Sequence, residues 1–132
     1  MRLDVAVEEL LPHPVEAVWS ALTDANAISD WLMPAEGFSP AVGARFRLRT
    51  QRLSPDGWVR VEVTELEPPH RMTWAWSLDN GLPPTSVTFE LSPAPDGTRL
   101  RLTHEGEIDP LAGGLVSDGW PGRIDELRRS LD

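Results

Sequence analysis

Five short runs between residues 45 and 104 alternate apolar and polar side chains, and turn-forming residues separate each run from the next. Alternation with a period of two is typical of strands that bury one face. Pro-Asp-Gly, at 55–57 and again at 95–97, fits a type I turn followed by a left-handed glycine, which is a common hairpin connection. Tight turns between consecutive strands predict an antiparallel meander. The five runs are Arg45–Leu53, Trp58–Leu66, Arg71–Leu78, Ser86–Leu91 and Thr98–His104.

The residues before the meander predict one further strand and two short helices. Residues 3–7 alternate like the later runs, so we expect six strands in all. Pro14 suits the first position of a helix that continues to Thr23, since the apolar residues after it recur at helical spacing. A second short helix is expected over 25–32, because Pro34 closes it.

The last part of the chain predicts a long helix with one flaw. Asp109 suits the cap position and Pro110 the first turn. Gly113 and Gly114 weaken a helix, and Pro121 removes one of its hydrogen bonds, so we expect a kink or break near Gly119–Gly122. The apolar stripe of this helix consists of Val116, Trp120, Ile124, Leu127 and Leu131.

Together these elements predict an α+β chain with the helix-grip arrangement. A six-stranded curved antiparallel sheet is expected to wrap around the long C-terminal helix, with two short helices after the first strand. A chain of 132 residues has the size of one domain, residues 1–132. The apolar sheet face needs the helix as a cover, whereas the other face alternates Arg, Glu and Thr. We interpret that second face as water-facing, and a binding surface for an acidic partner is the alternative.

Composition excludes several kinds of chemistry. The chain has no Cys, Lys or Tyr, so thiol nucleophiles, thiolate metal sites and Schiff-base lysines are excluded. The formal net charge of -9 has the wrong sign for a nucleic-acid partner. The three His are dispersed and no phosphate-binding loop occurs, so we expect neither a metal nor a cofactor. Without an export signal or a membrane-spanning run, a cytoplasmic protein with no membrane partner is expected.

The candidate binding site is the apolar face of the predicted sheet. Pockets for small molecules are mostly apolar with a few polar groups. Residue parity places His104 on this face as a possible orienting or proton-transferring group, with Arg52 as a second polar residue. Two alternatives stay open: the aromatic rings fill the interior and leave no cavity, and His104 is a hydrogen-bonded core residue. The candidate ligand-binding residues are Trp31, Met33, Phe46, Arg52, Trp74, Trp76, Phe89, Leu102, His104 and Trp120.

Seven segments carry a resemblance that covers nearly the whole chain: Pro14–Asp24, Trp31–Leu32, Val42–Phe46, Glu67–Trp74, Ser86–Leu91, Gly97–Gly106 and Gly119–Trp120. In this order they resemble the START-like (SRPBCC) superfamily and, more narrowly, the bacterial homologues of the activator of the heat-shock protein 90 ATPase. The resemblance implies an apolar cavity between the sheet and the last helix, which relatives use for lipids, sterols or polyketide intermediates. Ala44, where the family often has a second Gly, and Pro121 depart from the pattern.

Three functions follow from these observations. The first is binding of a small hydrophobic or aromatic molecule between the sheet and the C-terminal helix, as a carrier, sensor or scavenger that is a monomer or homodimer. The second is a stress-related co-chaperone or protein-interaction module, with a heat-shock protein 90 chaperone as partner. The third is a cyclase- or hydrolase-type enzyme that uses His104 as acid or base. The missing side-chain chemistries favour a non-enzymatic role over this third one.

Overall fold

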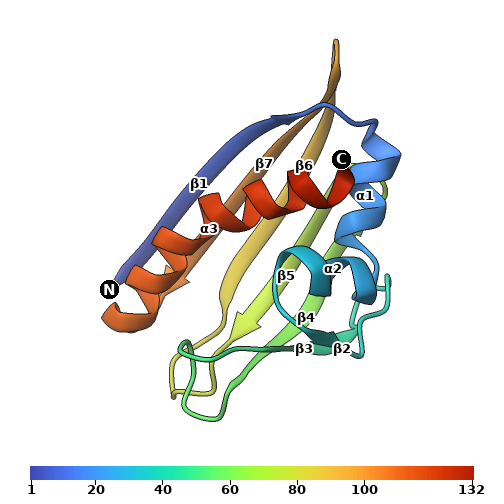
Figure 1. Ribbon diagram of the computed structural model, residues 1–132. Coiled ribbons are helices and arrows are strands. Elements are labelled where there is room, and N and C mark those ends of the chain that lie inside the picture. Colours follow the sequence, from blue (N-terminus) through green and yellow to red (C-terminus); the bar gives the residue numbers. More distant parts are fainter.

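The computed structural model describes residues 1–132 and contains one antiparallel sheet of seven strands, in the order β1-β7-β6-β5-β4-β3-β2. Helix α3 crosses one face of this sheet, and α1 and α2 lie on the same side, next to the C-terminal end of α3 (Figure 1). The α+β helix-grip fold predicted from the sequence is therefore confirmed. The strands are β1 (Arg2–Leu11), β2 (Ala35–Glu36), β3 (Arg45–Arg49), β4 (Trp58–Glu67), β5 (Arg71–Ser77), β6 (Thr85–Ala94) and β7 (Gly97–Glu107).

Strands β3 to β7 form the predicted meander, since each pairs antiparallel with the next. The strand β1 closes the other edge by pairing with β7. The expected number of six strands was one too low, because the two-residue β2 pairs with β3 and is too short to show any alternation. The inward-facing positions of the meander are buried, as the alternation predicts: Phe46, Leu48, Val59, Val61, Val63, Met72, Trp74, Trp76, Val87, Phe89, Leu91, Leu100 and Leu102.

The two short helices are α1 (Val15–Leu22) and α2 (Ala25–Trp31). Asp24 caps α2 by accepting a hydrogen bond from the backbone N–H of Ala27 at 2.9 Å. The indole Nε1 of Trp31 donates to the carbonyl oxygen of Ala21 at 2.9 Å and so fastens α2 to α1. This contact keeps the α2–β2 segment in a fixed position beside α3.

Helix α3 (Pro110–Leu131) is continuous through Pro121, so of the kink or break predicted near Gly119–Gly122, the break was wrong. Pro121 lies on the exposed side of the helix, where water can solvate the carbonyl group that loses its hydrogen bond. Its neighbour Trp120 is buried, and the apolar stripe holds both halves of the helix against the sheet. Asp109 caps the helix as expected, accepting from the N–H of Ala112 at 3.0 Å. No helix is both long and apolar enough to cross a membrane.

Strand β3 ends four residues earlier than predicted, at Arg49 rather than Leu53. Residues 50–57 form a loop instead, because the N–H of Thr50 bonds to the carbonyl oxygen of Gly57 at 2.9 Å and closes the turn early. The hydroxyl of Ser54 organises the loop from inside, accepting from the N–H of Trp58 at 3.0 Å and donating to its carbonyl oxygen at 2.7 Å. This loop, called the 50–57 loop below, carries Arg52 away from the sheet face.

Candidate ligand-binding pocket

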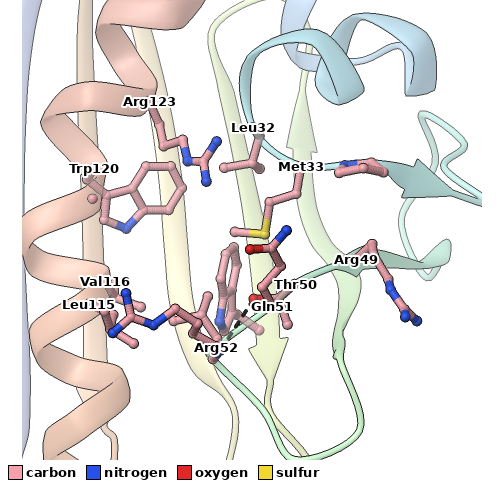
Figure 2. A pocket seen from close by; sticks show the side chains of 14 residues that line it. Leu32, Met33, Arg49, Thr50, Gln51, Arg52, Leu115, Val116, Trp120 and Arg123 are labelled. Atoms are coloured by element: carbon pink, nitrogen blue, oxygen red, sulfur yellow. Dashed lines mark hydrogen bonds between the residues drawn. The ribbon is translucent and has the colours of Figure 1, made fainter.

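One pocket opens beside α3, between this helix, the end of α2 and the 50–57 loop (Figure 2). Its volume is about 380 Å³, within the range of small-molecule sites. Helix α3 contributes one wall of this pocket. The residues that follow α2 and the 50–57 loop contribute the opposite wall, and β5 contributes Trp76. The lining residues are Leu32, Met33, Pro34, Arg49, Thr50, Gln51, Arg52, Leu53, Trp76, Leu115, Val116, Gly119, Trp120 and Arg123.

The buried part of the lining is apolar and aromatic. Trp76 and Trp120 are 2% and 3% exposed, and their ring centroids lie 5.9 Å apart. Leu32 and Val116 extend this surface on either side, and both are buried. Flat indole rings beside aliphatic side chains suit the faces of an aromatic or aliphatic ligand.

The exposed part of the lining is polar and basic. Gln51, Arg52 and Arg123 are exposed, and none of the fourteen lining residues is acidic. Arg49 also lines the pocket, but its guanidinium stacks on the ring of Trp58, 5.0 Å from the ring centroid. The pocket thus has an apolar interior and a positively charged mouth, in a chain whose formal net charge is -9.

His104 lies outside this pocket. It belongs to a series of buried hydrogen bonds behind the indole rings of Trp76 and Trp120. The Nε1 of Trp120 donates to the Nδ1 of His104 at 3.0 Å, and the Nε2 of His104 lies 2.7 Å from the Oγ1 of Thr85. Because an indole can only donate, Nδ1 is the acceptor and Nε2 carries the proton. Thr85 then donates to the carbonyl oxygen of Trp76 at 3.3 Å, so the polar side-chain atoms of Trp120, His104 and Thr85 all have hydrogen-bond partners. Burial lowers the pKa of His104 to about 4, so the imidazole is neutral at pH 7.

The structure places four of the ten candidate residues around the pocket and six elsewhere. Met33, Arg52, Trp76 and Trp120 line the pocket, whereas His104 belongs to the hydrogen-bonded chain just described and Trp31 joins α2 to α1. The remaining four pack in the interior: Phe46, Trp74, Phe89 and Leu102.

The interior aromatic rings contact one another in edge-to-face pairs. The ring centroids of Phe46 and Trp74 are 5.2 Å apart, and those of Trp74 and Phe89 are 4.8 Å apart. Such pairs fill the space below the middle of the sheet, so the aromatic residues there serve packing. The cavity therefore lies at the side of the fold, where α3 passes the 50–57 loop, rather than centrally between sheet and helix.

Sequence reasoning overlooked several lining residues, above all Gly119, Arg123 and Gln51. A signal for two of them was present, since Gly119 lies three positions after Val116 and Arg123 three positions after Trp120, and residues three or four apart share a helix face. Nothing in the alternation pattern indicates Gln51, because residues 50–53 are predicted as the end of a strand.

One buried polar atom of the pocket lining has no partner. The indole Nε1 of Trp76 is buried and makes no hydrogen bond within the protein. A buried donor without an acceptor costs about 1–3 kcal/mol. The Nε1 of Trp74 is in the same state, but Trp74 does not line the pocket. The structure assembles no group of three or more His, Cys, Asp or Glu side chains that could hold a metal ion.

Comparisons with known proteins agree with this architecture. The family described as Activator of Hsp90 ATPase homolog 1-like protein matches residues 12–132. The crystal structure of protein MLL2253 from Mesorhizobium loti is similar over 98% of this chain and 96% of that chain, with 34% identity and a TM-score of 0.84. CalU16 from Micromonospora echinospora is 29% identical over 98% of this chain and 76% of its own, with a TM-score of 0.79.

A third similar structure, protein BH1534 from Bacillus halodurans, covers 99% of both chains at 26% identity and a TM-score of 0.79. The comparison with curated proteins finds no match.

Proposed function

Given that the chain belongs to the family of Activator of Hsp90 ATPase homolog 1-like proteins, we propose that it binds a small hydrophobic or aromatic molecule in the pocket beside α3. The observation that carries this proposal is a cavity of about 380 Å³ whose buried surface consists of Trp76, Trp120 and aliphatic side chains. The role that fits this arrangement is that of a carrier, sensor or scavenger.

The properties of the pocket support binding rather than turnover. The liquid volume of one water molecule is about 30 Å³, so the cavity takes the place of about a dozen waters. Displacing water from an apolar surface is favourable by about 25 cal/mol per Å². No side chain in the lining is a common acid, base or nucleophile, and His104 is held behind the indole rings with both of its ring nitrogens bonded.

The experiment uses N-phenyl-1-naphthylamine, an uncharged aromatic dye whose fluorescence rises in apolar surroundings. We expect it to bind the wild-type protein with a stoichiometry of one and to quench the emission of the pocket tryptophans. The substitution Gly119→Leu is designed to fill the cavity. A Cβ at Gly119 meets no atom within 4 Å, so a side chain can enter this space without displacing the protein.

The matched control is Gly122→Leu, since Gly122 also lies on α3 with open space around its Cβ but does not line the pocket. Both substitutions raise helix propensity by a similar amount, about 1 kcal/mol or less. We expect the Gly119 variant to lose at least tenfold in dye affinity and the Gly122 variant to keep the wild-type value. Equal affinity in both variants would exclude this pocket as the binding site.

A further inference from the structure

The distribution of arginine partners around the pocket points to the class of ligand, an inference that rests on the proposed function. Six of the arginines have a carboxylate within 4 Å: Arg45, Arg47, Arg60, Arg71, Arg128 and Arg129. Arg52 and Arg123 have neither a carboxylate within this distance nor a hydrogen bond to another side chain. Six of the twelve arginines thus lack a carboxylate partner, and two of these six, Arg52 and Arg123, lie together at one pocket mouth.

These two arginines approach the pocket from opposite walls. Arg123 extends from α3 in the direction of Leu32, and Arg52 extends from the 50–57 loop in the direction of Leu115 (Figure 2). Arg49 points away from both, in agreement with its stacking on Trp58. The mouth is therefore flanked by two guanidinium groups, each with free N–H donors.

A guanidinium presents a planar set of donors that matches the oxygen atoms of carboxylate, sulfonate or phosphate groups. No acidic side chain in the lining competes for these donors or repels an incoming anion. The buried part of the lining offers mainly apolar and aromatic contacts, and its polar groups are the unpaired indole N–H of Trp76 and the hydroxyl of Thr50, which accepts from the N–H of Leu53. The two halves of the pocket thus suit the two ends of one amphipathic molecule.

We infer that the ligand is an amphipathic anion, with an apolar or aromatic body that lies against Trp76 and Trp120 and an acidic oxygen-containing group held between Arg52 and Arg123. The body supplies most of the affinity by displacing water, and the arginines select for the charge. This arrangement favours an anion over a neutral sterol or hydrocarbon of similar size, because only the anion pairs with the two guanidinium groups.

The test compares two dyes that share one ring system. The dye 8-anilinonaphthalene-1-sulfonate carries a sulfonate on the same rings that N-phenyl-1-naphthylamine has without charge. In the double variant Arg52→Gln with Arg123→Gln, we expect the sulfonate dye to bind about tenfold more weakly, because each exposed guanidinium–anion contact contributes a factor of about three to five at most. The neutral dye should bind this variant within a factor of two of the wild type.

A second double variant, Arg99→Gln with Arg101→Gln, is the control for net charge. Both residues are exposed on the side of β7 that faces away from α3, and neither has a carboxylate partner, so the same two charges are removed far from the pocket. We expect it to bind both dyes like the wild type. Raising NaCl from 0.05 to 0.5 M should weaken the sulfonate dye in the wild type and in this control, but much less in the pocket variant.

The outcomes separate the two proposals. If the neutral dye binds at the site blocked by Gly119→Leu and the pocket arginines make no difference to the sulfonate dye, the anionic ligand class is wrong and the binding function stands. If the loss of the pocket arginines weakens both dyes equally, the arginines do not select for charge and the inference is again overturned. If neither dye is sensitive to Gly119→Leu, the proposed function itself fails.

Discussion

His104 is the one ionisable side chain that the fold encloses completely. Its two ring nitrogens join α3, through Trp120, to β6, through Thr85. The imidazole therefore acts as a polar bridge inside an apolar core, and its neutral form is the one that the bridge requires, since Nδ1 must accept.

This bridge predicts a loss of stability in mild acid. The pKa of His104 is lowered by burial from 6.5 to about 4, so between these values the unfolded chain takes up a proton that the folded protein does not. The folded state is thus favoured at pH 7, and lowering the pH to 4.5 should remove about 2–3 kcal/mol of the free energy of unfolding through His104. Urea denaturation at both pH values measures this loss.

Carboxylates also titrate in this range, so the diagnostic quantity is a difference between variants. We expect His104→Gln to be less stable than the wild type at pH 7 and to lose about 2–3 kcal/mol less on acidification. His70→Gln, which removes a histidine from an exposed turn, is the control for the loss of a histidine at a surface position. Identical pH dependence in the wild type and the His104 variant would show that the imidazole is protonated without unfolding.

At the scale of elements, the hairpin between β6 and β7 depends on a single glycine. Gly97 has φ = +154°, and a Cβ built there would lie 2.0 Å from the carbonyl oxygen of Leu11 on β1. This close approach lets the chain cross the end of the hairpin directly after β1. Thr98, the next residue of the hairpin, adds a second contact with this segment, because its hydroxyl donates to the carbonyl oxygen of His13 at 2.7 Å.

The substitution Gly97→Ala should therefore destabilise the protein by about 3 kcal/mol or more, because the backbone of Leu11 has to move in addition to the strain at positive φ. Gly81→Ala is the matched control: φ is +84° there, but a Cβ meets no atom within 4 Å. It should cost only the conformational term, about 1 kcal/mol. Chemical denaturation of both variants checks the difference, and equal losses would mean that the contact with Leu11 is unimportant.

Elements with a regular period were predictable from the sequence, and irregular ones were not. Alternation identified the buried face of β3 to β7, because neighbouring side chains of a strand point to opposite sides whatever the tertiary context. The two-residue β2 has no period to detect. The early end of β3 at Arg49 depends on a hydrogen bond between Thr50 and Gly57, which no local pattern reveals.

The pocket was only partly predictable for the same reason. Trp74 and Trp76 have equal parity on β5, yet Trp74 packs between Phe46 and Phe89 whereas Trp76 borders the cavity. Parity states which face a residue occupies and says nothing about which neighbours fill the space above it. Arg52 and Arg123 line one pocket only because the 50–57 loop approaches α3, a proximity that sequence spacing does not reveal.

For the molecule as a whole, occupation of the pocket should be measurable as stability. A ligand that binds only the folded state at ten times its Kd adds about 1.4 kcal/mol to the free energy of unfolding. For a chain of 132 residues we expect this to raise Tm by about 5 °C. The measurement is thermal unfolding with and without N-phenyl-1-naphthylamine.

In the same measurement, the Tm of the Gly119→Leu variant should be the same with and without the dye. The Tm of Gly122→Leu should rise with the dye as it does in the wild type. A shift of equal size in all three proteins would place the dye outside the pocket. A wild-type Tm that the dye leaves unchanged would contradict binding to the folded state altogether.

The origin of the pocket lining in four separate stretches of chain has a consequence for how such a protein diversifies. Of its fourteen residues, Trp76 and Trp120 also belong to the buried core and are constrained by folding, whereas the exposed residues of the 50–57 loop and Arg123 are not. Drift at these surface positions changes ligand preference at little cost in stability. Substitutions at the exposed lining positions can therefore alter ligand preference, while the buried residues that serve both the core and the pocket stay unchanged.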